Sequence, residues 1–158
     1  MGLLVKTDSL VAFLGYKKRF FVIFMEKVYT IAPWGLKGVL VEVETNLSRH
    51  LPKTIVVGLP DASVQEARER VWAAIENSGY DFPRQKVVIN LSPAQIRKEG
   101  GSYDLSMAIS VLVKSGYFSL RGKIAFLGEL SLSGNINPVP GILVMVDSLK
   151  ELGFKQVF

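Results

Sequence analysis

The chain has 158 residues, of which 49% are hydrophobic and 21% charged, proportions typical of a folded globular protein rather than a disordered one. It has no cysteine and one histidine, which excludes disulfide scaffolds, thiol catalysis and metal sites built on cysteine ligands. The net charge of +5 is a first indication of nucleic-acid binding, although more than half of the excess lies in residues 1–24.

Residues 1–24 differ in character from the rest of the chain. They hold two short apolar runs on either side of Lys17, Lys18 and Arg19. A transmembrane helix needs ~20 apolar residues in a row, and these charges interrupt any such run. The order of charged and apolar residues is also not that of a signal peptide. We therefore predict an extra extension, with Met25 as an internal start; the alternative is a membrane-surface anchor.

The first half of the remaining chain predicts three strands and a helix. Residues 27–32 and 38–44 are rich in β-branched residues, and 38–44 alternate between apolar and polar positions, as strands do. Residues 54–58 predict a short buried strand. Ser63 and Glu66 then fit a capping box at the start of a helix that ends at Gly79.

The second half predicts further elements in the following order: a strand at 86–91, a loop at 92–102, a helix at 103–115, a strand at 123–130, a hairpin strand at 135–139, a helix at 140–152 with Pro140 at its first position, and a strand at 154–158. This order indicates an α+β domain with two layers, helices over one sheet. Because the chain stops within a new strand, we expect a C-terminal truncation of a longer protein.

The segment 97–104 is the densest cluster of functional side chains. Two glycines permit a tight backbone path, Ser102 suits a helix cap, and Asp104 suits the first helical turn. Two functional alternatives stand beside this structural one. Arg97 and Lys98 are candidates for contact with an anion or a partner, and Ser102 is a candidate nucleophile. His50 has no second histidine or cysteine near it, so we predict no metal site, and the chain lacks a P-loop.

Six ordered motifs from about Met25 to the last residue resemble one family. They are Val41-Glu42-Val43, Val57 to Asp61, Arg68 to Gly79, Asn90 to Ala94, Arg97 to Leu105 and Gly128 to Gly134. This pattern is similar to the N-terminal domain of the magnesium-chelatase-like AAA+ ATPases, a family that includes YifB-type proteins and the competence protein ComM. Residues 25–158 are thus expected to be this domain, which precedes the AAA+ ATPase module.

The resemblance implies a ribosomal protein S5 domain 2-like fold, similar to the proteolytic domain of Lon. It also implies a helicase-type motor that processes DNA in recombination or natural transformation and forms a homo-oligomer (a hexamer). Because the chain has no cysteine and no secretion signal, we expect a cytoplasmic protein, without stable membrane association. ATP and Mg²⁺ belong to the ATPase module, so no cofactor is expected in this part. The domain itself is expected to be non-catalytic and to serve oligomerisation or DNA engagement.

Similarity to Lon offers an enzymatic alternative. Lys98-Glu99-Gly100-Gly101-Ser102 resembles the loop that carries the Lon nucleophile, which falls on Ser102. In the second Lon segment Leu143 stands where the lysine base is expected, so only Lys98 is left as a substitute base.

The candidate residues therefore form two groups. Candidates for DNA or subunit contact are Arg68, Arg70, Arg84, Lys86, Arg97 and Lys98. Candidates for a structural loop motif are Gly58, Pro60, Asp61, Glu99, Gly100, Asp104, Gly128 and Glu129. Glutamates alternate with the arginines on the helix around Arg68, a pattern that is also typical of an ordinary solvated face.

Overall fold

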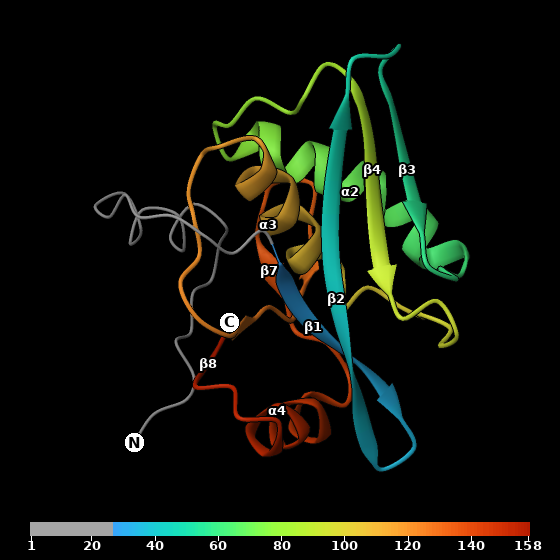
Figure 1. Cartoon of the computed structure of the whole chain (residues 1–158), viewed down its shortest axis with the longest axis vertical. Coiled ribbons are helices and arrows are strands. Elements are labelled where there is room, and N and C mark those ends of the chain that lie inside the picture. The colour runs from blue at the N-terminus through green and yellow to red at the C-terminus, as the bar shows by residue number, and fades with distance from the viewer. Residues whose placement is uncertain (1–26) are drawn as a thin grey trace.

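A six-stranded mixed sheet with three helices organises residues 27–158, the part of the chain that the computed structural model describes (Figure 1). The elements are β1 (Val28–Trp34), β2 (Lys37–Ser48), β3 (Lys53–Val57), α2 (Ala62–Asn77), β4 (Lys86–Ser92), α3 (Asp104–Lys114), β5 (Ile124–Ala125), β6 (Glu129–Leu130), β7 (Ile136–Asn137), α4 (Ile142–Glu151) and β8 (Gln156–Val157). The strand order is β3-β4-β2-β1-β5-β8. The predictions on residues 1–24 lie outside the described residues.

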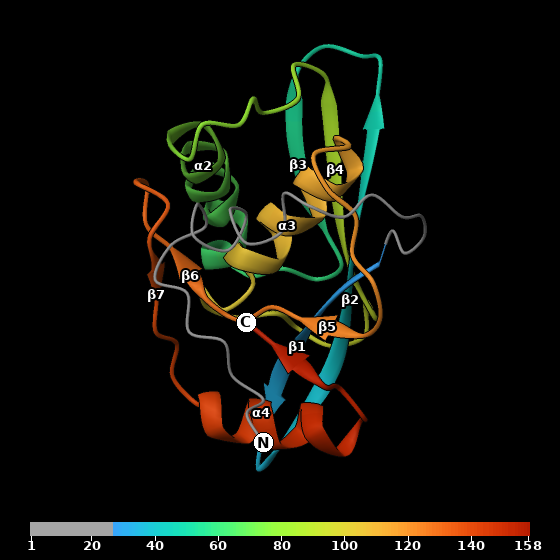
Figure 2. The same ribbon diagram turned by 90° about the vertical axis from the view of Figure 1, so that its left-hand side faces the viewer.

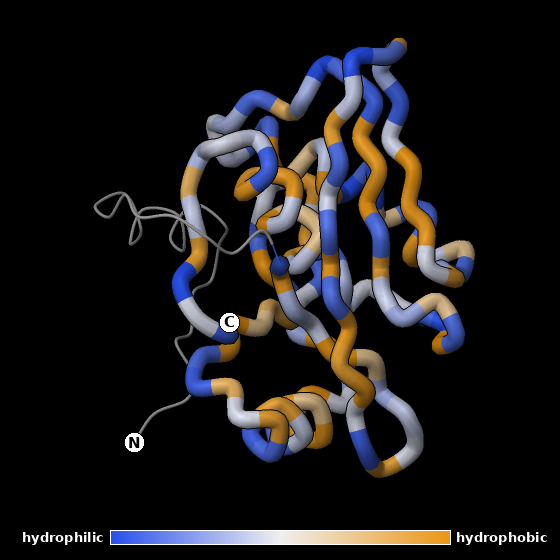
Figure 3. The backbone as a smooth tube through the Cα atoms, in the orientation of Figure 1, coloured by the Kyte–Doolittle hydropathy of each residue, from blue (hydrophilic) through white to orange (hydrophobic). Residues whose placement is uncertain are grey.

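The long strand β2 joins two halves of the sheet. Its first half pairs antiparallel with β1 around a tight turn at Gly35, whose φ of 60° suits glycine. Its second half pairs antiparallel with β4, and β3 adds to β4 in parallel. The predicted strand at 38–44 is confirmed, and pairing with β4 extends it to Ser48. Figure 3 shows hydrophobic and hydrophilic residues alternating along β2, whereas most of β3 is continuously hydrophobic.

Helix α2 is confirmed, but its predicted cap is wrong. The N-cap is Asp61, whose Oδ1 accepts a hydrogen bond from the Val64 amide at 2.8 Å. Ser63 lies inside the first turn instead. An aspartate caps a helix as well as a serine does, and here Asp61 is the residue with the extended backbone that a cap requires. The helix buries Val64, Ala67, Val71, Ala74 and Ile75, as its periodicity predicts.

Helices α2 and α3 cover the same face of the sheet (Figure 2). Helix α3 is buried along most of its length, and its hydroxyls have partners inside the protein. Ser110 Oγ lies 2.8 Å from Thr45 Oγ1 of β2, for example. These two helices and the sheet form the main core.

The predicted strand at 123–130 is wrong as a single element. It divides into β5, which lies between β1 and β8 in the main sheet, and β6, which forms a separate hairpin with β7. The chain turns away between them because the Phe126 amide still bonds to Tyr29 of β1, whereas the Gly128 amide bonds to Ser102 in the loop before α3. The predicted hairpin and the last predicted strand are both confirmed.

Helix α4 lies apart from α2 and α3 in Figure 1, beside the β1–β2 hairpin. Tyr29 and Ile31 of β1 point to the α4 side, whereas Val28 and Ala32 point to the α3 side. Around β4 the domain has the expected two layers, helices over one face of the sheet. Around β1 the expectation is wrong, because α4 covers the other face of the sheet and adds a third layer. The fold is α+β. Pro140 lies before α4 rather than at its first position, and Gly141, with φ 75°, is its N-cap.

Candidate functional site

Four segments that carry the family resemblance meet around the first turn of α3. They are Gly58–Asp61, Arg70, Lys98–Asp104 and Gly128–Leu130, and we call them the motif cluster. The Asp61 amide donates to the Lys98 carbonyl at 3.0 Å, and the Lys98 amide donates to the Leu59 carbonyl at 3.1 Å. Pro60 forms an isolated bridge with Lys98. The spacing of these motifs in the sequence thus reflects contact in space.

Lys98 is fully buried, which corrects its prediction as a DNA or subunit contact. Its ammonium donates hydrogen bonds to the carbonyl of Gly58 at 2.8 Å and to the carbonyl of Pro93. Burial lowers the pKa of Lys98, because a charged amine is less favourable away from water. The side chain therefore fastens the loop before α3 to the end of β3 and does not face a partner.

Arg70 and Asp104 form an ion pair inside the motif cluster. Arg70 Nε lies 2.7 Å from Asp104 Oδ2, and Nη2 lies 3.1 Å from Oδ1, so the contact is bidentate. The Leu130 amide also donates to Asp104 Oδ2, at 3.2 Å. Burial raises the pKa of Asp104, and Arg70 opposes that rise. Arg70 was predicted to contact DNA or a subunit, and the structure places its guanidinium on Asp104 instead.

Glycines of the motif cluster allow close approaches of the backbone. A Cβ on Gly128 would lie 2.6 Å from Ile136 of β7, and one on Gly101 would lie 2.4 Å from the Glu129 carboxylate. Gly100 has a φ of 81°, which a glycine adopts without strain. Glu99 is at the surface and pairs with Arg97 at 3.3 Å. Gly101 and Gly128 thus permit the close backbone approaches of the motif cluster, whereas the side chain of Glu99 contributes no buried contact.

No hydrogen bond joins Ser102 to a basic side chain among the described residues. The serine is buried, and Lys98, four residues earlier, uses its ammonium on two carbonyls. Leu143, at the position of the lysine in the Lon pattern, is exposed on α4. A serine hydroxyl needs a base within hydrogen-bond reach to act as a nucleophile at neutral pH. The geometry thus gives no support to a dyad of Ser102 and Lys98.

We accordingly expect no peptide hydrolysis that depends on Ser102. Wild-type protein and a Ser102→Ala variant should cleave an unstructured fluorogenic casein at the same background rate. A cleavage rate that falls to background only in the variant would restore the peptidase alternative.

A second surface of interest lies at the end of the sheet where β2 ends and β3 and β4 begin, at the top of Figure 1. Four cationic side chains line two adjoining hollows there: Lys53, Arg68, Arg84 and Lys86. We call these four residues the basic end. Lys53 lines both hollows, Arg68 and Arg84 share one with it, and Lys86 shares the other. Three of the predicted contact residues, from α2, a loop and β4, are thus brought together.

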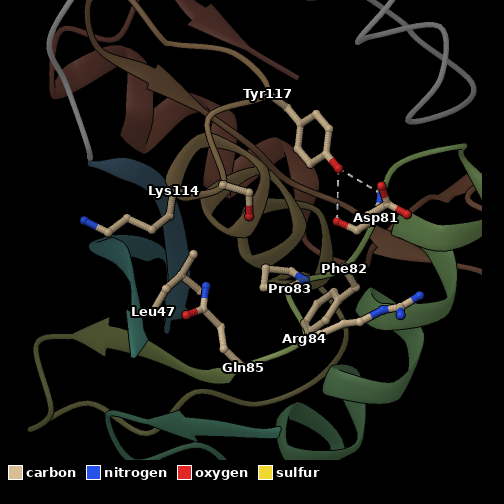
Figure 4. A pocket seen from close by; sticks show the side chains of 9 residues that line it. Leu47, Asp81, Phe82, Pro83, Arg84, Gln85, Lys114 and Tyr117 are labelled. Carbon is tan, nitrogen blue, oxygen red and sulfur yellow. Dashed lines mark hydrogen bonds between the residues drawn. The ribbon is translucent and has the colours of Figure 1, made fainter. Parts of the chain in front are cut away.

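The larger hollow, the α2 groove, has a volume of about 750 Å³ and lies between the outer face of α2 and the loop before β4. Another hollow, of about 620 Å³, lies on the other side of that loop (Figure 4). In Figure 4 Arg84 extends toward α2 and away from Lys114. The Tyr117 hydroxyl accepts from the Asp81 amide at 3.0 Å and donates to the Asp81 carbonyl at 3.3 Å, which holds the loop that carries Arg84.

The last predicted contact residue, Arg97, is not part of the basic end. It lies beyond the opposite end of β4 from Lys86. Sequence reasoning also missed two residues of the α2 groove, Lys53 and Trp72. Helical periodicity could have identified Trp72. It directly follows Val71, which belongs to the buried face of α2, so its indole lies on a different face of the helix, away from the core.

Neither a metal site nor a membrane-crossing helix is found in residues 27–158. No group of three or more His, Asp or Glu side chains in this part is arranged to hold a metal ion. None of its helices is both long enough and apolar enough to cross a bilayer. His50 lies at the surface beside Lys53 and Lys86.

Comparisons with known proteins agree with the motif pattern. YifB of Salmonella typhimurium is 43% identical over 118 residues, which are 73% of this chain and 23% of that protein. Competence protein ComM of Haemophilus influenzae is 37% identical over 118 residues, with the same coverage of both chains. Archaeal Lon protease of Thermococcus kodakarensis is 28% identical over 111 residues, 70% of this chain and 18% of that protein.

The chain thus spans about a quarter of the length of the YifB and ComM relatives that it matches. The predicted resemblance to these proteins is confirmed, and so is a more distant similarity to Lon. Residues 43–158 match the family described as subunit ChlI of Mg-chelatase. Since this match covers well over half of its residues, the chain belongs to that family.

Proposed function

We propose that this chain is a non-catalytic accessory domain of a longer, cytoplasmic AAA+ ATPase similar to YifB and ComM, and that it engages DNA through the basic end. The chain matches only about a quarter of the length of YifB and ComM, which supports a role as one part of a larger protein. The ATPase activity, with its ATP and Mg²⁺, would belong to the remainder, and so would the homo-oligomer that the resemblance predicts.

The observation that supports DNA engagement is the convergence of four cations from separate segments at the basic end. Of these four cations, Arg68 forms an ion pair within residues 27–158, with Glu69 at 3.5 Å, whereas Arg84 and Lys53 form none. Positive charges that lie close together repel each other, and binding of an anionic partner reduces this repulsion. A phosphate backbone is such a partner. The similarity to a relative named as a competence protein, ComM, supports the same proposal.

The finer fold assignment belongs to the same proposal. We infer a ribosomal protein S5 domain 2-like fold of the kind found in the Lon proteolytic domain. The identity of 28% to archaeal Lon over 111 residues supports it, as does a mixed sheet with two helices on one face. Leu143 stands where the Lon pattern has its lysine base, which is consistent with a domain that keeps this fold without peptidase activity.

Arg84→Ala is the direct test of the basic end. We expect the wild-type chain to bind a labelled 30-nucleotide DNA in fluorescence anisotropy, with an affinity that falls as salt rises. Each phosphate contact contributes about 0.7–0.9 to the slope of log K against log salt. Arg84→Ala should therefore weaken binding to every sequence and lower that slope by about 1.

Arg97→Ala is the matched control, because Arg97 is an exposed arginine outside the basic end. It should leave both affinity and slope unchanged. Absence of binding at low salt, or equal losses in the two variants, would contradict DNA engagement through this surface.

A further inference from the structure

An exposed tryptophan lies in the α2 groove. Trp72 is 51% exposed and lines the groove together with Lys53, Arg68 and Arg84. Arg68 and Trp72 are four residues apart on α2, so they lie on the same outward face of the helix. The core does not require the indole, because α2 contributes a different set of residues to it.

Two of the three cations that line the α2 groove form no ion pair within the described residues. Two carboxylates also line the groove: Glu69 pairs with Arg68, and Glu76 accepts a hydrogen bond from the Phe82 amide at 2.8 Å. Within the described residues Lys53 and Arg84 have no ion-pair partner. The groove therefore presents an aromatic face flanked by positive charge.

We propose that the α2 groove binds single-stranded DNA, with one base stacked on Trp72 and the adjacent phosphates at Lys53 and Arg84. Proteins that bind single strands without sequence preference combine a cationic groove with aromatic side chains on which bases stack. In a duplex each base already stacks on its neighbours, so a duplex could reach the cations but not the indole. This inference rests on the proposed function and adds the kind of DNA that is bound.

An extended peptide fits the groove less well. A peptide would bind here by adding a strand to the open edge of β3, which needs free backbone groups on that edge. Gln65 Nε2 already donates to the Val56 carbonyl at 3.2 Å, so α2 occupies part of the edge. We therefore favour the nucleic acid and treat peptide binding as an outcome of the test.

The two tryptophans of the chain provide the experiment with its own control. Trp34 is 62% exposed at the tip of the β1–β2 hairpin, at the opposite end of β2 from the basic end. In the full chain carrying Trp34→Phe, the remaining fluorescence comes from Trp72, and titration with a 12-nucleotide oligothymidine should quench it. In the chain carrying Trp72→Phe, the same titration should leave the fluorescence of Trp34 unchanged.

Affinity gives the second measurement. Stacking of a base on an aromatic side chain is lost in Trp72→Ala, which should weaken binding of the single strand about 5- to 150-fold. Trp72→Phe should retain most of the affinity, since phenylalanine also stacks. Wild type, Trp72→Ala and Trp72→Phe should bind a duplex of equal length with the same affinity. A single strand that lacks bases should bind wild type no more tightly than the duplex does.

The outcomes separate the inference from the proposed function. Duplex and single strand bound equally, with no effect of Trp72→Ala, would overturn the inference and leave DNA engagement standing. Quenching of Trp72 by an unstructured peptide but not by oligothymidine would overturn it in favour of a peptide groove. Absence of binding to any DNA would overturn both.

Discussion

Arg70→Ala is expected to lower the free energy of unfolding by about 3–5 kcal/mol at pH 7, because it leaves a buried carboxylate without its partner. Asp104 is fully buried, and the Leu130 amide would be its remaining hydrogen-bond donor among those described here. Urea unfolding, followed by circular dichroism at 25 °C, measures the change directly.

The cost should depend on pH. Burial raises the pKa of Asp104, and Arg70 opposes the rise, so the pKa climbs further in Arg70→Ala. A carboxyl with a raised pKa in the folded state favours folding when protonated. This contribution is complete below the unfolded pKa, ~3.9, and is lost as pH rises through the folded pKa. The stability gap between variant and wild type should therefore narrow as the pH is lowered from 7 toward 4.

Arg68→Ala serves as the control for Arg70→Ala. Arg68 lies on the same helix, but its side chain is exposed and its pair with Glu69 is open to solvent. Exposed pairs contribute little, so we expect a change below about 0.5 kcal/mol with no pH dependence of the gap. Equal losses in the two variants would show that α2 tolerates no alanine there and that the buried pair has no special role.

Gly58→Ala is also expected to lower the free energy of unfolding by about 3–5 kcal/mol, because it combines backbone strain with a steric clash. Gly58 has a φ of 103°, which disfavours any side chain. An added Cβ would also lie 2.0 Å from the Leu91 carbonyl oxygen on β4. A backbone atom of a paired strand cannot move aside without parting β3 from β4. The carbonyl of Gly58 also accepts a hydrogen bond from Lys98, so the motif cluster would be disturbed too.

Gly79→Ala isolates the backbone cost. Gly79 follows α2 with a φ of 82°, but an added Cβ there would meet no atom within 4 Å. Its loss should be about 1–2 kcal/mol, the price of the left-handed conformation alone. Thermal unfolding of both variants, compared with wild type, gives the difference. A Gly58→Ala variant no less stable than Gly79→Ala would mean that β3 and β4 can separate at that point at little cost.

Local patterns in the sequence predict most of the elements, because alternation and helical periodicity are short-range properties. They fail where a contact distant in sequence decides the structure. The strand predicted at 123–130 reads as continuous, but Phe126 bonds to β1 and Gly128 to the loop before α3, so the strand divides. The third layer was missed for a similar reason, because the two faces of β1 are both apolar and the pattern does not say which helix covers each.

For the candidate site, the sequence identifies residue types but not their surroundings. Lys98 and Arg70 are cations like Arg84, and composition does not distinguish an ammonium held by carbonyls from one in solvent. The grouping of Lys53 with Arg68 and Arg84 depends on how α2 lies against the start of β3, which no motif encodes. Gly58, Lys98 and Asp104 all lie in the motifs, but the motifs alone do not predict that these residues meet around the first turn of α3.

The pairing of β2 has a mechanical consequence. Its 12 residues extend about 40 Å, and β1 holds the first half while β4 holds the second, with overlap only at Glu42 and Val43. Helix α3 crosses behind, against β1, β2 and β4. A force along β2 would load the hydrogen bonds on both sides of the strand in shear, because those bonds lie across its axis. Bonds loaded in this way break together rather than one by one, so β2 would resist a pull between the β1–β2 hairpin and the end of the sheet where β3 and β4 begin.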